Sequence, residues 1–263
     1  MGSKSFFVAI QGISFKLQAG NRISHKDTTV IRDGVSSERK IVIPIDTLLT
    51  RIQSNNEQPL CIGIDLTGSE IRPSGVCVFR GRGAYLSLVS SDEDILRLVE
   101  KSGGGLISID SSLGLPAGRC CVYDTCECRK YGIMRECERI LRKRGIRVYP
   151  TLIKSMQNLT LRGIGLARTF RDAGYTVIES YPGAAQDILQ FPRKKINLCQ
   201  LEKDLVAMGI VPHSEKEPVT HDQLDALTSA LVGYFYLAGM YETIGNEAEG
   251  YLVLPELSSL DTG

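Results

Sequence analysis

The pattern of apolar and polar residues changes near residue 60, and the two sides of this point predict different kinds of structure. Before it, the short apolar runs FFVAIQ, FKLQ, TTVIR and KIVIPID are interrupted by Gly, Asn and Ser, which is typical of short strands. A short helix, DTLLTRIQS, is expected next with Asp46 as its cap, and the polar SNNEQP is expected to be a linker. We therefore predict a small β-rich appendage over residues 1–57 and a larger domain over residues 58–263.

Beyond residue 60 the apolar runs are longer, and their order predicts an α/β fold. LCIGIDL, VCVFRG and AYLSLVS are joined by short turns, which favours three consecutive antiparallel strands. SSDEDILRLVEKSGGG has Ser and Asp at its start and glycines at its end, as a helix does. LISIDSS predicts a second buried strand, and the helix before it supplies the crossover that parallel pairing requires.

The second half of the chain predicts mainly helices around one more strand. The expected strand is YTVIESYP, and the expected helices are IMRECERILRKRG, LTLRGIGLARTFRDAG, GAAQDILQF, NLCQLEKDLVAMG and HDQLDALTSALVGYFYLAGM, with EGYLVLPE closing the domain. The resulting order is three strands, a helix, a strand, a helical insertion, a strand and then helices. That is the element order of the RNase H-like fold, which is a mixed sheet with helices on both faces.

Composition and charge limit the classes of protein that fit. A chain of 263 residues with 43% hydrophobic and 23% charged residues can bury a core without disulfides. The formal net charge is only +1, so a surface for nucleic acid would have to be local; residues 192–195 and 139–147 are the basic candidates. No apolar run approaches the roughly 18 residues that span a bilayer. The N-terminal stretch lacks a cleavage-site pattern, so we expect a cytoplasmic protein without membrane contact.

Two aspartates stand at the ends of apolar strands. Asp65 ends GID and Asp110 ends ISID, and a carboxylate in such a place is stable only when a cation or donor compensates its charge. If the two strands are adjacent and parallel, both carboxylates emerge at one end of the sheet. Glu179, in VIESYP, is a third acid in the same situation. A single aspartate at a strand end is usually a turn residue, but several at matching ends favour a metal site.

The last long helix carries two more acids. Asp222 and Asp225 are three residues apart, so they share a helix face and repel each other unless a cation bridges them. Hard oxygen ligands of this kind suit Mg²⁺ or Mn²⁺. Two such ions can activate water and stabilise the leaving oxygen of a phosphodiester. His221, beside these acids, could ligate metal, transfer a proton or cap the helix.

These segments resemble a known family. GIDLTGSE, ISIDSSLGLP, RECERILRKRGIRVYPT, IESYPGAAQDIL and HDQLDALTSAL resemble the domain-of-unknown-function 429 family of predicted nucleases with an RNase H fold, over residues 60–256. The His221 to Asp225 stretch is also similar to the C-terminal motif of RuvC-type junction resolvases. The resemblance implies a metal-dependent nuclease acting on DNA or RNA. In it Asp65 is the first-strand acid, Asp110 the fourth-strand acid, Asp222 and Asp225 the last-helix acids, and Glu179 an addition.

Five of the eight cysteines crowd between the fourth predicted strand and the next helix: Cys120, Cys121, Cys126, Cys128 and Cys137. Their spacing matches neither the CxxC pairs of zinc ribbons nor that of ferredoxins. The neighbouring Arg119, Arg129 and Lys130 would favour thiolates. Zinc, an iron–sulfur cluster, a reactive dithiol and buried free thiols all remain open at this point.

Two other functions compete with the nuclease. GIDLTGSE is also similar to the first phosphate loop of actin-like ATPases and sugar kinases, and an iron–sulfur relative of these activates 2-hydroxyacyl-CoA dehydratases. That superfamily uses two copies of the fold, whereas this chain has no second such loop and no clear glycine-rich adenosine motif. A non-catalytic module that binds a protein through the appendage is the third hypothesis, which the four aspartates oppose.

Overall fold

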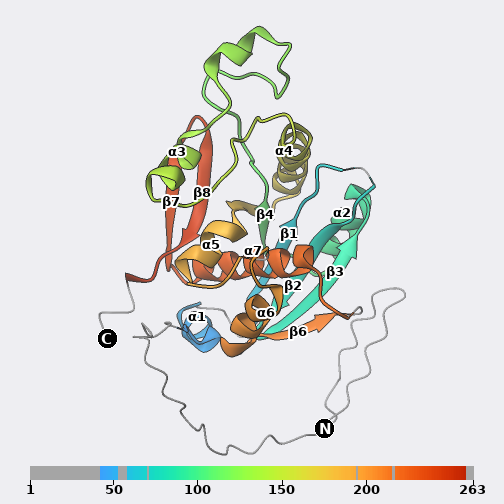
Figure 1. Cartoon of the computed structure of the whole chain (residues 1–263). Helices are drawn as coiled ribbons and strands as arrows, with labels where there is room; N and C mark the ends of the chain where they lie inside the picture. The colour runs from blue at the N-terminus through green and yellow to red at the C-terminus, as the bar shows by residue number, and fades with distance from the viewer. Residues whose placement is uncertain (1–41, 53–57, 70, 194, 215–216, 259–263) are drawn as a thin grey trace, which may run out of the picture. The chain divides into compact units, whose positions relative to one another are not determined.

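The computed structural model describes residues 42–52, 58–69, 71–193, 195–214 and 217–258 (Figure 1). The chain divides into two units, Met1–Lys40 and Ile41–Gly263, and every described residue belongs to the second. The strands predicted in the appendage therefore lie outside the described residues, apart from residues 42–46 of the last one, which form no strand: residues 42–44 are irregular and residues 45 and 46 begin a helix. Among the described helices, none has both the length and the apolar character needed to cross a membrane.

An eight-stranded mixed sheet forms the centre of the described unit. Its strand order is β6-β3-β2-β1-β4-β5-β8-β7. Strands β1 to β3 are antiparallel neighbours, whereas β4 pairs in parallel with β1 and β5 in parallel with β4. The predicted antiparallel trio and the parallel first and fourth strands are thus confirmed. The strands are β1 (Leu60–Asp65), β2 (Ser74–Arg80), β3 (Gly83–Val89), β4 (Leu106–Asp110), β5 (Thr176–Ser180), β6 (Val211–Ser214), β7 (Tyr241–Asn246) and β8 (Gly250–Pro255).

The two outermost strands were not predicted from the sequence. β6 is only four residues long and includes a proline and a histidine, so it has no apolar alternation. β7 buries a single side chain, Ile244, and pairs with β8 as a hairpin. Edge strands form their hydrogen bonds on one side only and need little apolar sequence to do so, which explains why the pattern missed them.

Helices cover both faces of the sheet, as predicted. α7 lies across the strands with α5 and α6 on the same side (Figure 1), and its residues form one core with α1, α5 and α6. On the other face α2 and α4 bury Val99 and Phe170 with Ile64 and Ile109. The helices are α1 (Ile45–Arg51), α2 (Asp92–Lys101), α3 (Glu136–Lys143), α4 (Gln157–Asp172), α5 (Pro182–Ile188), α6 (Leu198–Ala207) and α7 (His221–Leu237), with a 3-10 helix η1 (Glu127–Tyr131).

Helix α1, which the sequence predicts as part of the appendage, packs into the core of the larger unit. Ile45 is buried there, and its backbone N–H donates to the Met208 carbonyl at 2.6 Å. The helix begins at Ile45 after Pro44, whose side chain makes no capping hydrogen bond. The expectation that Asp46 caps the helix was wrong: Asp46 lies in the first turn and forms an ion pair with Arg82.

Two glycines allow α7 to lie unusually close to the sheet. A Cβ atom at Gly63 of β1 would be 2.0 Å from the Ala226 carbonyl oxygen, and one at Gly75 of β2 would be 2.1 Å from that of Asp222. Both obstructing atoms belong to helix backbone, so they cannot turn aside as a side chain can. The close contact spans the first turns of α7 and therefore fixes where Asp225 lies against β1.

We predict that Gly63→Ala lowers the free energy of unfolding by about 1–3 kcal/mol, because the added methyl must push α7 away from β1. Urea unfolding followed by circular dichroism measures this change. Gly165→Ala is the matched control: this exposed α4 glycine has no neighbouring heavy atom within 4 Å of an added Cβ. The control should gain up to about 1 kcal/mol from helix propensity. Wild-type stability in Gly63→Ala would contradict the close contact.

Candidate metal centres

Three aspartates meet at one end of the sheet. Asp65 and Asp110 are Cα partners in the parallel pairing of β1 with β4, and Asp225 approaches them from α7. One carboxylate oxygen of each residue lies within 4.8 Å of those of the other two. Asp65 is 8% exposed and Asp225 4%, while Asp110 is half-buried. We call these three residues the acid triad.

The alternation of side chains along the strands explains why the two strand acids meet α7. Cys61 of β1 and Leu106 of β4 belong to the core beneath α7. Asp65 and Asp110 each lie four residues further on, an even number, so they project from the same face. The parallel register places them side by side at the carboxyl ends of their strands. The predicted convergence of Asp65, Asp110 and Asp225 is therefore present in the structure.

A buried amide orients the third acid. Gln186 of α5 is 1% exposed, and its Nε2 donates to Asp225 Oδ1 at 2.8 Å. The same nitrogen is 3.4 Å from the Thr228 hydroxyl. A buried carboxylate with a fixed amide donor has few alternative rotamers. No sequence signal identified Gln186, because its role depends on α5 packing against α7.

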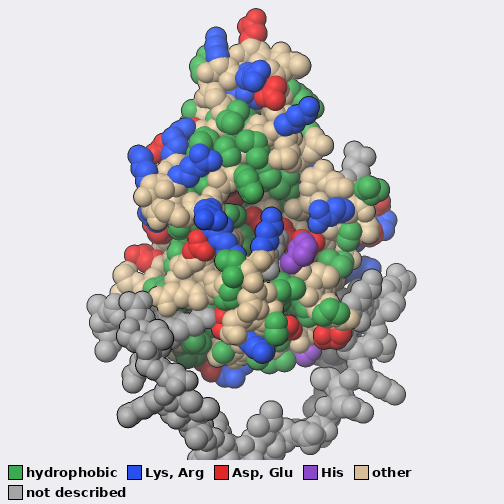
Figure 2. Space-filling model, viewed as in Figure 1, with side chains coloured by type: hydrophobic (Ala, Val, Ile, Leu, Met, Phe, Trp, Pro, Cys, Tyr) green, Lys and Arg blue, Asp and Glu red, His purple; other side chains and the backbone are tan. Residues whose placement is uncertain are grey.

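The donor set of the acid triad fits a divalent metal ion. Three carboxylates this close together repel one another unless a cation or protons reduce their charge. Carboxylate oxygens are hard ligands, which Mg²⁺ and Mn²⁺ prefer. Figure 2 shows a hollow near the middle of the viewed face, with acidic atoms at its back and Lys and Arg side chains around its edge. Asp110 is only half-buried, so the acid triad is not closed off from solvent.

Asp222 and His221 lie outside this group. Asp222 Oδ1 is 2.7 Å from His221 Nδ1, and Asp222 Oδ2 is 3.8 Å from Arg72 Nη2. The Asp222 side chain is 23% exposed and that of His221 is 50% exposed. Asp222 lies three residues before Asp225, which is about 4.5 Å along the helix axis and nearer to the solvent-exposed start of α7. Among the predicted last-helix acids, only Asp225 joins the group of three.

Glu179 faces the opposite side of the sheet from the acid triad. In the pairing of β4 with β5, Glu179 is opposite Ile109 and Ser180 is opposite Asp110. Side chains alternate between faces, so the β5 residue beside Asp110 is Ser180. The Ser180 hydroxyl accepts a hydrogen bond from Ser108 at 2.9 Å. The sequence placed Glu179 at the correct end of the sheet, and a register difference of one residue puts it on the wrong face.

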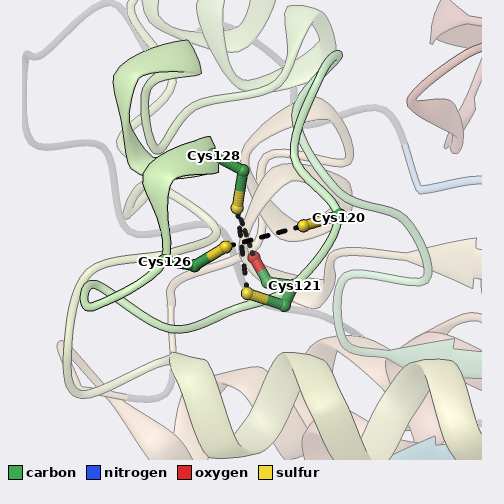
Figure 3. A group of neighbouring side chains, drawn as sticks. All are labelled: Cys120, Cys121, Cys126 and Cys128. Carbon is green, nitrogen blue, oxygen red and sulfur yellow. Dashed lines mark hydrogen bonds between the residues drawn. The ribbon is translucent and has the colours of Figure 1, made fainter.

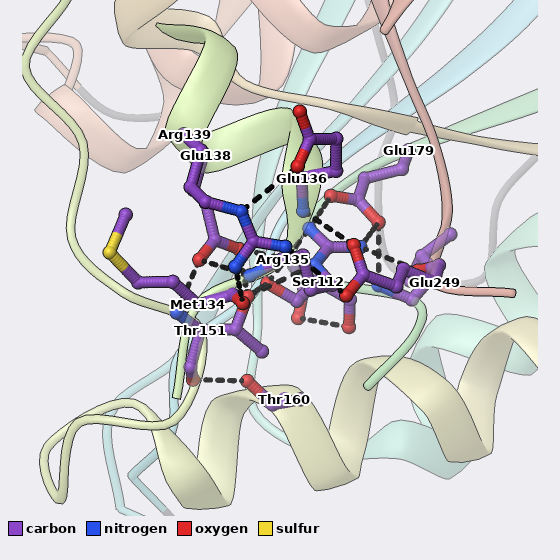
Figure 4. Close-up of polar contacts among 12 residues, drawn as sticks. Ser112, Met134, Arg135, Glu136, Glu138, Arg139, Thr151, Thr160, Glu179 and Glu249 are labelled. Atoms are coloured by element: carbon purple, nitrogen blue, oxygen red, sulfur yellow. Dashed lines mark hydrogen bonds and ion pairs between the residues drawn. The ribbon is translucent and has the colours of Figure 1, made fainter. Parts of the chain in front are cut away.

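Glu179 instead forms a buried ion pair with Arg135, which is 2% exposed (Figure 4). Arg135 Nη1 donates to Glu179 Oε2 at 2.9 Å, and its Nε donates to Glu138 at 3.1 Å and to the Thr151 hydroxyl at 3.0 Å. Burial opposes the charge of Arg135, but the adjacent Glu179 carboxylate more than compensates and raises its pKa above the ordinary value. The network ties α3 to β5.

A further buried carboxylate closes the base of the segment between β4 and α3. Glu249, 3% exposed, accepts hydrogen bonds from the backbone N–H groups of Ala117, at 2.8 Å, and Glu136. Burial by itself would raise the pKa of Glu249. These hydrogen bonds and the charge of Arg139 have the larger combined effect, so its pKa lies below the ordinary value. Residues 117 and 136 are thereby held together by one side chain from the β7–β8 hairpin. We call residues 117–136 the cysteine lobe.

Four cysteine thiols meet inside this lobe (Figure 3). The Sγ atoms of Cys120 and Cys126 are 3.6 Å apart, and those of Cys121 and Cys128 are 3.8 Å apart. All four sulfurs lie within 4.8 Å of one another. The hydrogen bond from the Cys120 backbone lowers the pKa of Cys128 to about 6, whereas the Cys128 and Cys126 thiols raise that of Cys120 to about 12. The four thiols could therefore share a metal ion.

The fifth predicted thiol, Cys137, does not belong to the cluster, so its inclusion was wrong. Cys137 lies on α3, 1% exposed, in a core with Leu141 and Ile244. Burial raises its pKa to about 12, as expected for an inert core thiol. Cys137 is close to the other four cysteines in sequence, but on α3 it lies on the apolar face that packs into this core.

Arg119 shapes the backbone around the four thiols. Its side chain is 7% exposed and donates to the carbonyl oxygens of Cys121 at 3.1 Å, Tyr123 at 3.1 Å and Gly132 at 3.4 Å. These three bonds connect the segment 121–123 with residue 132. They also keep a positive charge next to the Cys121 backbone. The sequence indicated Arg119 only as a nearby cation, since its bonds to the backbone depend on the loop conformation.

The comparisons with protein-family models, with curated proteins and with solved structures found no match. The resemblance to the domain-of-unknown-function 429 family therefore stays a prediction that rests on the motifs in the chain. The chemistry of the acid triad and of the four thiols is the basis on which a function can be proposed.

We predict that Asp65→Asn makes the metal-free protein at least as stable as wild type, because one repelling charge is removed from the acid triad. It should also reduce the stabilisation that Mg²⁺ gives, which for a binding-competent site is about 2.7 kcal/mol at 100 times the Kd. Thermal melts with and without Mg²⁺ measure both effects. Asp172→Asn, on the exposed end of α4, is the control and should keep the wild-type shift. Equal shifts in all three proteins would show that Asp65 binds no metal.

We predict that Glu179→Gln lowers the free energy of unfolding by about 3–5 kcal/mol, because it leaves the buried Arg135 without its main counter-charge. Denaturant unfolding measures this loss. Glu242→Gln breaks the more exposed ion pair with Arg144 and should cost less than about 1 kcal/mol. Similar values for the two variants would contradict the assignment of Glu179 to a buried structural pair.

Proposed function

We propose that this protein is a metal-dependent nuclease that hydrolyses phosphodiester bonds of nucleic acid at the acid triad. The observation that carries the proposal is the meeting of Asp65, Asp110 and Asp225 within 4.8 Å, on two strand ends and a helix. Carboxylates from different elements that gather at one place are costly for stability, because they repel and are partly desolvated. Such a cost is typical of a functional site rather than of a packing core.

The element order supports the RNase H-like part of the proposal. Three antiparallel strands are followed by a crossover helix and by two strands that extend the sheet in parallel, β4 and β5. Asp65 ends the first strand, Asp110 ends the fourth, and Asp225 lies on the last long helix. These are the places to which the resemblance assigns the acids of the family.

Asp65, Asp110 and Asp225 would hold the metal, and Gln186 would keep Asp225 in place. When bound, divalent ions supply the activation of water and the stabilisation of the leaving oxygen in phosphodiester hydrolysis. His221 is half-exposed at the start of α7, and Asp222 contacts its Nδ1. An imidazole oriented in this way can move a proton between the site and solvent.

Cationic side chains near the acid triad would contact phosphates. Arg72, 63% exposed, approaches Asp222 at the start of α7. Arg193 donates to the Tyr181 hydroxyl at 3.2 Å. Burial raises the pKa of Tyr181, Arg193 partly opposes this, and the charge of Asp110 adds to it, so Tyr181 lies within electrostatic reach of Asp110. Backbone phosphates are recognised mainly through such basic groups.

The glycine run does not support the competing ATPase hypothesis. Gly103, Gly104 and Gly105 all have positive φ angles and lie between the end of α2 and the start of β4. A Cβ at Gly105 would be 2.7 Å from the Leu60 carbonyl oxygen. The run is therefore explained by the end of a helix and a tight approach to β1, without a nucleotide.

We predict that the full-length protein cleaves at least one of a panel of single-stranded, double-stranded, hybrid and branched DNA and RNA substrates. Cleavage should need Mg²⁺ or Mn²⁺ and stop with EDTA. Asp65→Asn, Asp110→Asn and Asp225→Asn should each lower the rate at least 100-fold, while Asp172→Asn keeps it, because only the first three remove a triad charge. Labelled substrates resolved on gels measure the rates.

Two outcomes would overturn the proposal. The first is cleavage that persists undiminished in the three triad variants, since the activity would then belong to another site or to a contaminant. The second is the absence of cleavage on every substrate together with ATP hydrolysis that Asp65→Asn abolishes, which would favour the actin-like alternative.

A further inference from the structure

The cysteine lobe holds a second group of possible metal ligands, and this group includes none of the acids. We propose that Cys120, Cys121, Cys126 and Cys128 bind one zinc ion in a closed tetrahedral site that holds the cysteine lobe in shape. The proposal is independent of the nuclease proposal, because the four sulfurs and the acid triad are separate donor sets.

The distances between the sulfurs fit a single ion. Zinc–sulfur bonds of about 2.3 Å place the four sulfurs of a tetrahedron about 3.8 Å apart. The two measured pairs are 3.6 and 3.8 Å apart, and no pair in the group exceeds 4.8 Å. An iron–sulfur cluster places several irons and sulfides between its cysteines, so its thiolates stand further apart than those around one ion. The arrangement therefore favours a mononuclear site.

The same distances argue against two disulfides. A disulfide brings its sulfurs to about 2.05 Å, and both measured pairs are much longer. The two pairs are also close to each other, since all four sulfurs lie within 4.8 Å of one another (Figure 3). Each sulfur thus has the other three as neighbours, which is what a tetrahedral ion requires and what separate disulfides do not.

The cysteine lobe lacks the apolar core that would otherwise hold it. Between residues 117 and 136, all of which the structure describes, the buried side chains are those of Arg119, Val122, Cys128 and Arg135. A segment this small with one buried aliphatic side chain cannot order itself by hydrophobic burial. Glu249 holds the two ends of the lobe together through the backbone N–H groups of residues 117 and 136, and a cation bound by the thiols would hold the segment between them.

The charge around the thiols also fits. Four thiolates around Zn²⁺ carry a net charge of −2, which has to be balanced locally. The Arg119 guanidinium, bonded to the Cys121 carbonyl, supplies one buried positive charge, and the exposed Arg129 and Lys130 follow Cys128 directly. Four sulfur ligands leave zinc no open position, so the site is structural rather than catalytic.

The test measures the metal directly on the full-length protein, purified without a metal-chelating tag under reducing conditions. Elemental analysis should find one zinc per chain, and four thiols should become reactive only after a zinc chelator is added. Cys120→Ser and Cys126→Ser, which alter incompletely buried positions, should lose the bound zinc. Cys199→Ser, an exposed thiol on α6, is the matched control and should keep it.

Cobalt titration of the zinc-free protein gives a second readout that does not depend on how the variants fold. Co²⁺ should produce the intense absorption of tetrahedral thiolate coordination, and added Zn²⁺ should abolish it. Iron with a brown chromophore in anaerobically purified protein would overturn the proposal in favour of a cluster. Metal-free protein whose four thiols react without a chelator, or zinc retained in both ligand variants, would overturn it as well.

Discussion

The close contact between α7 and the strands β1 and β2 is the constraint on which the acid triad depends. Gly63 and Gly75 leave no room for a side chain between the sheet and the helix backbone, so α7 has one distance from the sheet over its first turns. Asp225 points from this region towards the ends of β1 and β4, where Asp65 and Asp110 already lie side by side. Bringing three carboxylates together is unfavourable because they repel one another. Burial of the apolar remainder of α7, which is buried over almost its entire length, offsets this free-energy cost.

Two groups of buried charged side chains lie on opposite faces of the sheet. On the side of α7, Asp65, Asp110 and Asp225 form the acid triad, whose clustered oxygens could hold a metal ion. On the other side, Glu179 and Glu138 are compensated by Arg135, and the result is structural. Residues one apart on β5 therefore have different roles: Ser180 lies beside Asp110, and Glu179 stabilises the attachment of α3. The alternation of side chains, rather than the choice of residue type, makes this distinction.

The sequence predicted most of the strands, the helices and the strand-end acids, because these follow from apolar periodicity and from carboxylates in apolar surroundings. It could not fix the register of β5, which depends on pairing with β4 and decides that Glu179 leaves the site. It also could not separate Cys137 from the four lobe thiols, since proximity in sequence says nothing about the face of α3. Arg135, Gln186 and Glu249 carried no local signal, because each acts on residues that are distant in the chain and depends on tertiary packing.

The two candidate metal centres call for different ions, and this difference limits how they can interact. The acid triad offers hard oxygens from three carboxylates, which suit an ion such as Mg²⁺ that keeps several water ligands. The lobe offers four soft sulfurs with no remaining position, which suits zinc and excludes magnesium. The lobe begins only a few residues after Asp110, and Glu249 joins its two ends at the sheet. An ion that stiffens the cysteine lobe therefore also restrains the chain that leaves β4 after Asp110. The zinc site would in this way support the geometry of the acid triad without sharing a ligand with it.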